Sequence, residues 1–251
     1  MAAAGYDAVS MGNHEFDYSF DALLDNMKVL TDAGVKVIDA NVINKETVKS
    51  YFDANAVFEF DGIKVGVFGL DTSETLTKAS PSNVKAVNFL DKEEMFKEAQ
   101  AQVDKLKSAG CDYIIALTHL GVDEESVGRR STDLAAAVKG IDLIVDGHSH
   151  TVIDGGEKVG DTVIVSTGSY LANVGTVVID KEAKTEEAKL ISAADYAAGT
   201  AQYDETVKAL VAEDVAEVAE AYSKVFAKTE VHLEGTKQIV RSQETNLGDF
   251  T

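Results

Sequence analysis

The stretch "CDYIIALTHLG", residues 111–121, passes from an apolar, β-rich run directly into a polar string that contains a histidine. The same arrangement occurs twice more, where "YDAVSM" leads into "GNHEFD" at residues 12–17 and "IDLIV" leads into "DGHSH" at residues 146–150. Each apolar run has the composition of a strand. Because the binding groups of open α/β sheets gather beyond the carboxyl ends of strands, the three strings predict one shared site.

The rest of the chain alternates short apolar runs with longer amphipathic ones, which is the pattern of an α/β protein. Residues 58–70 and 174–191 each predict a β-hairpin, because a turn-forming pair such as Asp61 and Gly62 separates two β-rich runs. The sheets are therefore expected to be mixed. The expected strands are 8–11, 35–40, 57–60, 64–70, 113–117, 143–145, 162–166, 176–179 and 187–191, and the expected helices are 20–33, 92–109, 131–138 and 203–227.

The composition is that of a chain with a large core and an excess of acidic residues. Hydrophobic residues make up 45% of the 251 positions, and 43 acidic residues against 23 basic ones give a formal net charge of −20. This charge argues against nucleic acid or an anionic membrane as a partner. No apolar stretch approaches the length of a membrane span, so membrane insertion is not expected. The single cysteine, Cys111, excludes an internal disulfide framework.

Four of the five histidines lie in the three polar strings, which makes them candidates for metal ligands. His148 and His150 alternate across one residue just after a strand, a spacing that lets two imidazoles bind one ion or two adjacent ions. They could instead be histidines of a surface loop, and His119 alone could be a core-edge histidine bonded to the backbone. The position of all three at strand ends favours a metal site.

The string at residues 12–17 offers two kinds of chemistry. Asn13 carries a neutral carboxamide oxygen that binds a divalent ion without cancelling its charge, which suits phosphoryl chemistry. His14 is predicted to face the substrate and to donate to a developing oxyanion or to the leaving oxygen. Asp17 is predicted to orient the His14 ring. It could instead be the N-cap of the following helix, a position for which Ser19 competes.

In this order, "GNHEFD", "THLG" and "DGHSH" resemble the motifs of the calcineurin-like metallophosphoesterases, and in these longer forms those of the 5′-nucleotidase and UDP-sugar hydrolase branch. The closing "RSQETNLGD", residues 241–249, is similar to the segment that links the catalytic domain of that branch to a C-terminal nucleotide-binding domain. The resemblance implies an α/β fold, a four-layer α-β-β-α sandwich in which two mixed sheets enclose a two-metal site.

By resemblance, Asn13, His119 and His148 would hold one divalent metal ion, and His150 would belong to the site of a second. Zinc, manganese and cobalt suit this ligand set about equally. The family opens its catalytic domain with an Asp-x-His strand and a Gly-Asp loop, which supply the remaining ligands, and neither string stands ahead of "GNHEFD" in this sequence. We therefore expect one ion or none in this chain, together with weak or absent activity.

The resemblance also implies a reaction. A metal-activated hydroxide would attack the phosphorus of a small-molecule nucleotide, with His14 stabilising the transition state and Asp17 as its partner. The substrates of the branch are 5′-nucleotides, and cyclic nucleotides or UDP-sugars remain alternatives. The metal ions would supply the positive charge that an acidic protein lacks. Members of the branch are commonly exported or held at the cell surface, and by this resemblance we expect export to the periplasm or cell surface here.

The two ends of the chain predict an incomplete domain. "MAAAGYD" indicates the last turn of a helix closed by Gly5, so the fold is expected to be N-terminally incomplete. Thr245 and Asn246 are helix-entry residues close to the last position. We expect residues 1–228 to form the catalytic domain and residues 229–251 to begin a linker to an absent C-terminal domain.

Three further expectations follow from these missing parts. The chain could be a non-catalytic truncated fragment or binding module that retains a partial metal site, and an Asp-x-His motif encoded upstream would decide for the enzyme. A sheet that lacks a strand leaves an exposed edge, which predicts self-association. Because the nucleotide-binding arginines would lie in the absent domain, Arg129 and Arg241 are expected to be surface charges.

Overall fold

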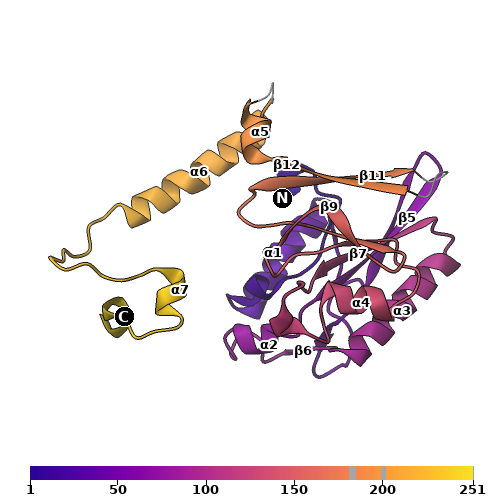
Figure 1. Ribbon diagram of the computed structural model, residues 1–251, viewed down its shortest axis with the longest axis horizontal. Coiled ribbons are helices and arrows are strands. Elements are labelled where there is room, and N and C mark those ends of the chain that lie inside the picture. Colours follow the sequence, from indigo (N-terminus) through magenta and orange to yellow (C-terminus); the bar gives the residue numbers. More distant parts are fainter. Residues whose placement is uncertain (181–184, 199–201, 251) are drawn as a thin grey trace. The chain divides into compact units, whose positions relative to one another are not determined.

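A six-stranded mixed sheet with the order β4-β5-β7-β8-β10-β9 organises the larger part of the protein in the computed structural model (Figure 1). The structure describes residues 1–180, 185–198 and 202–250, which divide into two units, Met1–Gln202 and Tyr203–Thr251. Strands β5, β7, β8 and β10 run parallel to one another, and β4 and β9 add antiparallel edges. The strands are β4 (Asn55–Phe60), β5 (Ile63–Asp71), β7 (Tyr113–His119), β8 (Leu143–Val145), β9 (Val152–Val159) and β10 (Thr162–Thr167).

The core of this sheet forms because its central strands are apolar and its main covering helix is amphipathic. Helix α3 (Glu93–Ser108) buries residues at helical spacing, among them Met95, Ala99, Val103 and Leu106. These residues belong to the same buried cluster as strand residues such as Phe68 of β5. Helix α4 (Ser131–Ala137) contributes Leu134 and Ala135 to this cluster. Burying each large side chain contributes about 1.5–3 kcal/mol.

A second apolar cluster holds the N-terminal part of the larger unit. It joins helix α1 (Phe20–Asp32) to two small sheets, the parallel pair β1 (Ala8–Val9) and β2 (Lys36–Val37) and the antiparallel pair β3 (Val42–Asn44) and β6 (Val87–Phe89). Phe16 is fully buried in this cluster, with its ring centroid 5.6 Å from that of Phe89. The cluster therefore fixes the loop that follows β1, which carries the first polar string.

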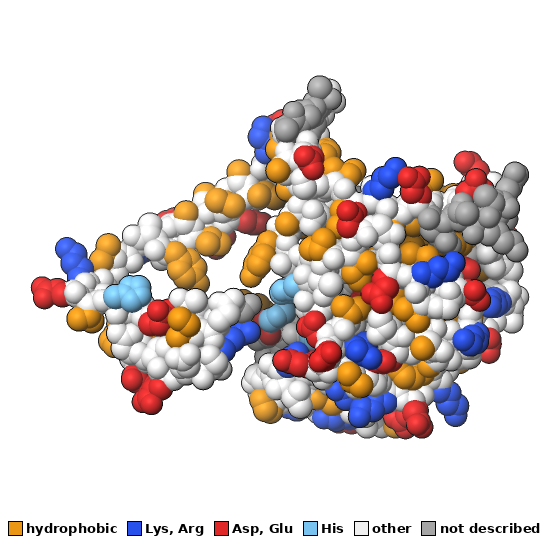
Figure 2. Space-filling model, in the orientation of Figure 1, with side chains coloured by type: hydrophobic (Ala, Val, Ile, Leu, Met, Phe, Trp, Pro, Cys, Tyr) orange, Lys and Arg blue, Asp and Glu red, His pale blue; other side chains and the backbone are white. Residues whose placement is uncertain are grey.

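The last part of the larger unit is the antiparallel hairpin β11 (Asn173–Asp180) and β12 (Thr185–Ser192), followed by α5 (Ala193–Ala198). The smaller unit contains α6 (Glu205–Tyr222), α7 (Lys237–Val240) and α8 (Asn246–Phe250). The Asp204 carboxylate accepts the backbone N–H groups of Thr206 and Val207 at the start of α6. Figure 2 shows hydrophobic side chains exposed along α6. The exposed large hydrophobic residues of this helix include Val211, Val215 and Val218. None of the helices in the described part of the chain is long and apolar enough to cross a bilayer.

The structure confirms the expected α/β fold with mixed sheets, and it gathers the strands outside the large sheet into three two-stranded sheets. All four expected helices are present, with ends within a few residues of those predicted. Both expected hairpins are confirmed, although residues 181–184 of the second lie outside the described residues. A short 3₁₀ helix, Ala2–Ala4, ends at Gly5 with φ 74°, as the N-terminal sequence predicts. Strands β3, β6 and β9 were not predicted.

Candidate active site

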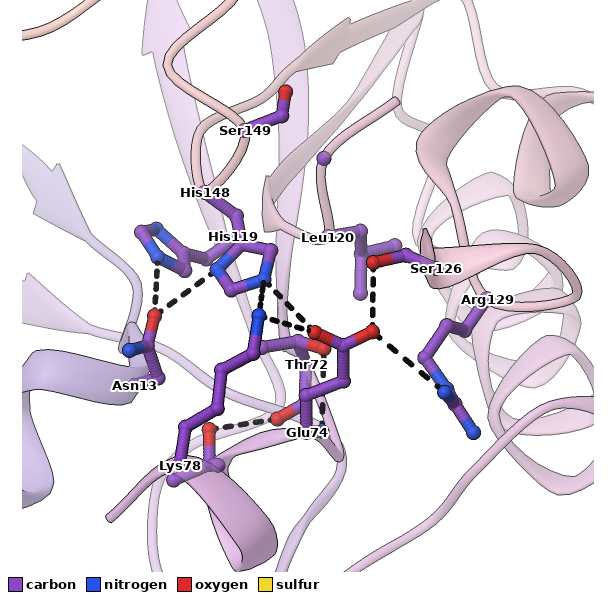
Figure 3. A network of polar contacts seen from close by, with 12 residues as sticks. Asn13, Thr72, Glu74, Lys78, His119, Leu120, Ser126, Arg129, His148 and Ser149 are labelled. Carbon is purple, nitrogen blue, oxygen red and sulfur yellow. Dashed lines mark hydrogen bonds and ion pairs between the residues drawn. The ribbon is translucent and has the colours of Figure 1, made fainter. Parts of the chain in front are cut away.

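Three strand ends converge on one group of polar side chains. His119 is the last residue of β7, and β8, which lies beside β7, leads into the string that contains His148. Asn13 opens a 3₁₀ helix, Asn13–Phe16, shortly after β1. Figure 3 shows these three side chains pointing toward one another. The structure thus brings together Asn13, His119 and His148, although the first of them is more than a hundred residues away in sequence.

The amide oxygen of Asn13 stands between the two imidazole rings. Its Oδ1 atom lies 3.1 Å from Nε2 of His119 and 3.0 Å from Nδ1 of His148. The two ring centroids are 5.1 Å apart, with the ring planes at 64°. Asn13 is only 7% exposed. One oxygen and two nitrogen donor atoms therefore face a common point.

The loop after β1 can approach His119 because it carries a glycine at the point of contact. A Cβ atom on Gly12 would lie 2.9 Å from Cε1 and Nδ1 of His119, which is closer than van der Waals contact allows. The side chain of Glu15 accepts the backbone N–H of Gly12 at 2.8 Å and so closes the 3₁₀ turn. Phe16, at the other end of that turn, is anchored in the apolar cluster. Asn13 is therefore held from both sides.

Asp146 ties together the loops that follow β7 and β8. Its Oδ1 atom accepts the Thr118 hydroxyl at 2.8 Å and the backbone N–H of Leu120 at 3.0 Å. Its Oδ2 atom accepts the Ser131 hydroxyl at 2.7 Å. Burial raises the pKa of Asp146, and these hydrogen bonds oppose the increase. The carboxyl group thus fixes His119 relative to the string at residues 146–150.

Both histidines of that string have left-handed backbone conformations, with φ 74° at His148 and 56° at His150. Non-glycine residues seldom adopt this conformation, and such residues cluster at functional sites. Ser149 stands between the two histidines, and their rings have different neighbours: that of His148 lies beside Asn13, and that of His150 does not. The His150 ring lies near Tyr170, at a centroid distance of 6.4 Å, and within the described residues it forms no hydrogen bond to Asn13, His119 or His148.

The electrostatic environment keeps the two central imidazoles neutral. Burial and the neighbouring His148 lower the pKa of His119 to about 3. Burial also lowers the pKa of His148, although Glu74 opposes the decrease. Neutral imidazole is the form that binds a metal ion. At neutral pH both rings are therefore ready to act as ligands without losing a proton to solvent.

His14 and Asp17 form the pair expected from the sequence. Nδ1 of His14 lies 2.7 Å from Oδ2 of Asp17, and the His14 side chain is 73% exposed. Ser19, and not Asp17, caps helix α1, because its hydroxyl accepts the backbone N–H of Ala22. The geometry leaves Asp17 available to orient the His14 ring, and its role in a reaction stays a prediction.

Glu74 is the residue of this site that the sequence motifs do not reveal. Its Oε2 atom lies 3.2 Å from Nε2 of His148 and 2.7 Å from Nζ of Lys78. Its Oε1 atom accepts the Ser126 hydroxyl at 2.7 Å and lies 3.7 Å from Arg129. Burial alone raises the pKa of Glu74, but the hydrogen bonds from Lys78, Ser126 and His148 together lower it to about 2. Figure 3 shows this network around the ionised carboxylate.

The expectation that Arg129 is a surface charge is wrong. Its side chain is 21% exposed and holds Asp91 by two hydrogen bonds, at 3.0 Å from Nε and 2.9 Å from the terminal nitrogen. The planar guanidinium suits such a two-point contact with a carboxylate. Arg129 therefore belongs to the ion-pair network beside the site. Arg241 is exposed, as expected.

The donor set fits a divalent metal ion, although it departs from the usual composition. Within the described ranges there is no group of three or more His, Cys, Asp and Glu side chains that could hold a metal ion. Here the third donor is the carboxamide of Asn13, which adds a neutral oxygen to the nitrogens of His119 and His148. Mixed oxygen and imidazole sites suit zinc, manganese and cobalt. The geometry assigns no corresponding place to His150.

Comparison with known proteins places this site in a family. Residues 1–174 match the family described as "Bacterial capsule synthesis protein PGA_cap". The chain is 31% identical to the trifunctional nucleotide phosphoesterase protein YfkN of Bacillus subtilis over 287 residues, which cover 100% of the chain and 19% of YfkN. It is 29% identical to the 5′-nucleotidase of Vibrio vulnificus, over 99% of the chain and 51% of that protein. The chain thus spans about a fifth to a half of the length of such relatives.

Solved structures share the fold. The 5′-nucleotidase precursor from Thermus thermophilus aligns with a TM-score of 0.68 and 29% identity, covering 97% of this chain and 49% of that one. The calcineurin-like phosphoesterase YfkN from Bacillus subtilis aligns with a TM-score of 0.68 and 24% identity, covering 89% and 74%. At that lower identity the second likeness concerns the fold alone.

Proposed function

The chain belongs to the PGA_cap family and to the 5′-nucleotidase branch of the metallophosphoesterases, and we propose that it hydrolyses phosphate esters of nucleotides with a divalent metal ion. The observation that carries the proposal is the position of Asn13 Oδ1 within 3.1 Å of one nitrogen of each of two partly buried imidazoles. Neutral imidazole nitrogens and an amide oxygen at one place are donor atoms that can bind a divalent ion.

Asn13, His119 and His148 would hold the ion, and His150 would serve a second one. When bound, a divalent ion supplies Lewis-acid activation of water and of the phosphoryl group. The protein contributes ligands that carry no charge, so the full positive charge of the ion acts on the substrate. Zinc, manganese and cobalt each fit this proposal.

His14 would act on the leaving group. Asp17 accepts a hydrogen bond from Nδ1–H, which fixes the orientation of the ring. The His14 side chain is exposed, so a substrate can reach it, and only the protonated ring, which carries a hydrogen on Nε2 as well, can donate that proton or a hydrogen bond to the leaving oxygen. A positioned donor of this kind contributes about 10²–10⁴-fold to the rate.

The proposed substrates are 5′-nucleotides, with cyclic nucleotides and UDP-sugars as further candidates. The names of the relatives support this class, since they include a trifunctional nucleotide phosphoesterase and several 5′-nucleotidases. A cavity of about 250 Å³ beside His119, lined in part by Tyr6 and Met11, offers space next to the site. We also propose export to the periplasm or cell surface, which agrees with relatives described from snake venom.

The proposed organisation assigns residues 1–228 to catalysis and residues 229–251 to a linker. Self-association is proposed through the small sheet formed by β1 and β2, because each has one edge without a strand partner among the described residues. Sedimentation over a hundredfold range of concentration tests this. A single species with the mass of one chain at every concentration would contradict it.

Metal stoichiometry and hydrolysis test the main proposal together. After dialysis against zinc or manganese, elemental analysis should find about one ion per chain, and the His119→Ala variant should lose it. His232, 85% exposed on the smaller unit, provides the matched control, and His232→Ala should retain the ion. Release of phosphate from nucleoside monophosphates should require the metal. Metal binding without any hydrolysis would support a binding module, and no metal binding would refute the site.

A further inference from the structure

We propose that Glu74 is a positioning residue for His148: it accepts a hydrogen bond from Nε2–H of that ring and thereby leaves Nδ1, the nitrogen beside Asn13, free to bind a metal ion. The proposal rests on the metal site of the proposed function and extends it to residues that none of the three sequence motifs contains. It follows from the contacts of the two His148 nitrogens: Nδ1 points toward Asn13, and Nε2 points toward Glu74 (Figure 3).

A neutral imidazole carries one proton, and its two nitrogens therefore have different roles. Nδ1 of His148 faces Asn13 Oδ1 at 3.0 Å, whereas Nε2 faces Glu74 Oε2 at 3.2 Å and Lys78 Nζ at 3.3 Å. A ligand nitrogen must be unprotonated. If Asn13 and His148 bind the same ion, the His148 proton must lie on Nε2.

Of the two groups that face Nε2, Glu74 and Lys78, only one can accept a hydrogen bond from a protonated Nε2. The Glu74 carboxylate is an acceptor, and the Lys78 ammonium has hydrogens to donate but no lone pair. Lys78 donating to Nε2 would favour the opposite tautomer, with the proton on Nδ1 and directed at Asn13. Glu74 and Lys78 therefore select opposite tautomers of His148, and only the one selected by Glu74 can bind the ion together with Asn13.

The surroundings of Glu74 hold its carboxylate in place for this task. Ser126 donates to Oε1 at 2.7 Å, which leaves Oε2 directed at His148. The side chains of Glu74 and His148 are 11% and 9% exposed, so water competes little for their contact. The Lys78 side chain is 45% exposed and can turn toward solvent. Carboxylate partners of this kind commonly change metal affinity by about 10–100-fold.

The test compares four variants with the wild-type chain. Glu74→Ala removes the acceptor, and Glu74→Gln keeps a weaker carbonyl acceptor of the same shape. Asp91→Asn is the matched control, because Asp91 shares Arg129 with Glu74 but does not contact His148. The double variant Glu74→Ala with Lys78→Met removes one negative and one positive charge, so the local net charge equals that of the wild type.

The first readout is the tautomer of His148 in the metal-free chain, measured by ¹H–¹⁵N correlation of the five histidine side chains. A His148→Asn variant assigns the signals. We expect Glu74→Ala to increase the share of the Nδ1-protonated form, Glu74→Gln to do so less, and Asp91→Asn to leave it unchanged. An unchanged tautomer ratio in Glu74→Ala would overturn the proposal, whatever happens to metal binding.

The second readout is zinc affinity by titration calorimetry. Glu74→Ala should bind zinc about 10–100-fold more weakly, and Glu74→Gln should recover part of the loss. The double variant should remain at least about tenfold weaker than the wild type, because the acceptor is still absent. Recovery of wild-type affinity in the double variant would show that Glu74 acts by charge alone and would overturn the proposal.

The two readouts separate this inference from the proposed function. If the wild-type chain binds no zinc while Glu74→Ala still shifts the His148 tautomer, the metal site fails and the role of Glu74 in setting the ring stands. If zinc binds normally in every variant and the tautomer does not move, the metal site stands and the role of Glu74 fails. Melting curves of all variants confirm that each is folded.

Discussion

Two carboxylates of this protein, the partly buried Glu74 and the fully buried Asp39, have pKa values shifted in opposite directions. Glu74 sits among Lys78, Ser126 and Arg129, and its pKa is lowered to about 2. Asp39 is fully buried, and desolvation raises its pKa to about 7. Burial raises the pKa in both cases. The positive charges and hydrogen-bond donors beside Glu74 outweigh burial, and the neighbours of Asp39 do not.

The surroundings of Asp39 explain the difference. Its Oδ1 atom accepts the backbone N–H groups of Asn41 and Val42, both at 3.0 Å. Ser10 and the backbone of Met11 approach closely enough to lower the pKa somewhat, but Oδ2 forms no hydrogen bond among the described residues. Asp71 lies nearby, also fully buried, and its pKa is raised by burial and by Asp39. The fold thus places two acids together, and no cation of the described residues contributes to the pKa of either.

The two groups affect stability at opposite ends of the pH range. The folded pKa of Glu74 is below its ordinary value of 4.5, so its contribution is present above pH 4.5 and is lost as the pH falls toward 2. The folded pKa of Asp39 is above its ordinary value of 3.8, so its contribution is present below pH 3.8 and is lost as the pH rises through 7.

The largest expected effect is that of Asp39→Asn. The change from 3.8 to about 7 corresponds to about 4 kcal/mol of unfolding free energy lost between pH 4 and pH 8. Asparagine can still accept the two backbone N–H groups but does not titrate, so the variant should lack this decrease. Denaturant unfolding at several pH values measures the difference between variant and wild type. Parallel pH curves for the two proteins would contradict the assignment.

The effect of Glu74→Gln on the free energy of unfolding should be largest at neutral pH and should disappear in acid, the reverse of the effect at Asp39. Relative to the wild type the variant should be less stable by about 3 kcal/mol at pH 7, and the difference should shrink as the pH falls from 4.5 toward 2. Glu59, exposed on the edge strand β4, provides the control, and Glu59→Gln should change little. A constant difference across the pH range would mean that Glu74 stabilises the fold without its charge.

A smaller effect on stability is expected for substitutions of Arg129, which lies 3.7 Å from Oε1 of Glu74 and pairs with Asp91. Arg129→Gln removes the two-point contact with Asp91 and the nearby charge at Glu74, and it should cost about 1.5–3 kcal/mol. Arg129→Lys should recover only part of this, because an ammonium group cannot hold a carboxylate at two points. Chemical denaturation at pH 7 measures both variants. Full recovery by lysine would contradict the geometric argument.

The sequence predicted the elements and residues whose signals are local. The strings after 8–11, 113–117 and 143–145 follow apolar runs, so the meeting of Asn13, His119 and His148 could be anticipated from strand ends. Strands β3 and β6 have only three residues each, and β9 contains a glycine pair and charged residues. None of these three shows the β pattern on which a prediction can rest.

Glu74 was missed because its signal depends on the register between strands. It lies in "DTSETLTK", residues 71–78, a polar segment without helical or strand periodicity. Yet this segment follows β5, and Asp71 of β5 is the register partner of His119 of β7. A polar segment after a third parallel strand should reach the same edge of the sheet. The order of strands in the sheet, which the sequence does not contain, was the missing information.

The exposed carboxylate Asp17 completes the comparison, because its removal should affect catalysis and hardly affect stability. The His14 and Asp17 side chains are 73% and 48% exposed, and exposed pairs contribute little to folding. Asp17→Asn should therefore melt close to the wild-type temperature. Under the proposed function it should lower kcat about 10-fold or more, with KM little changed, because His14 would lose its orienting partner while the metal ligands remain intact. A large loss of stability with unchanged kcat would instead assign Asp17 to the fold.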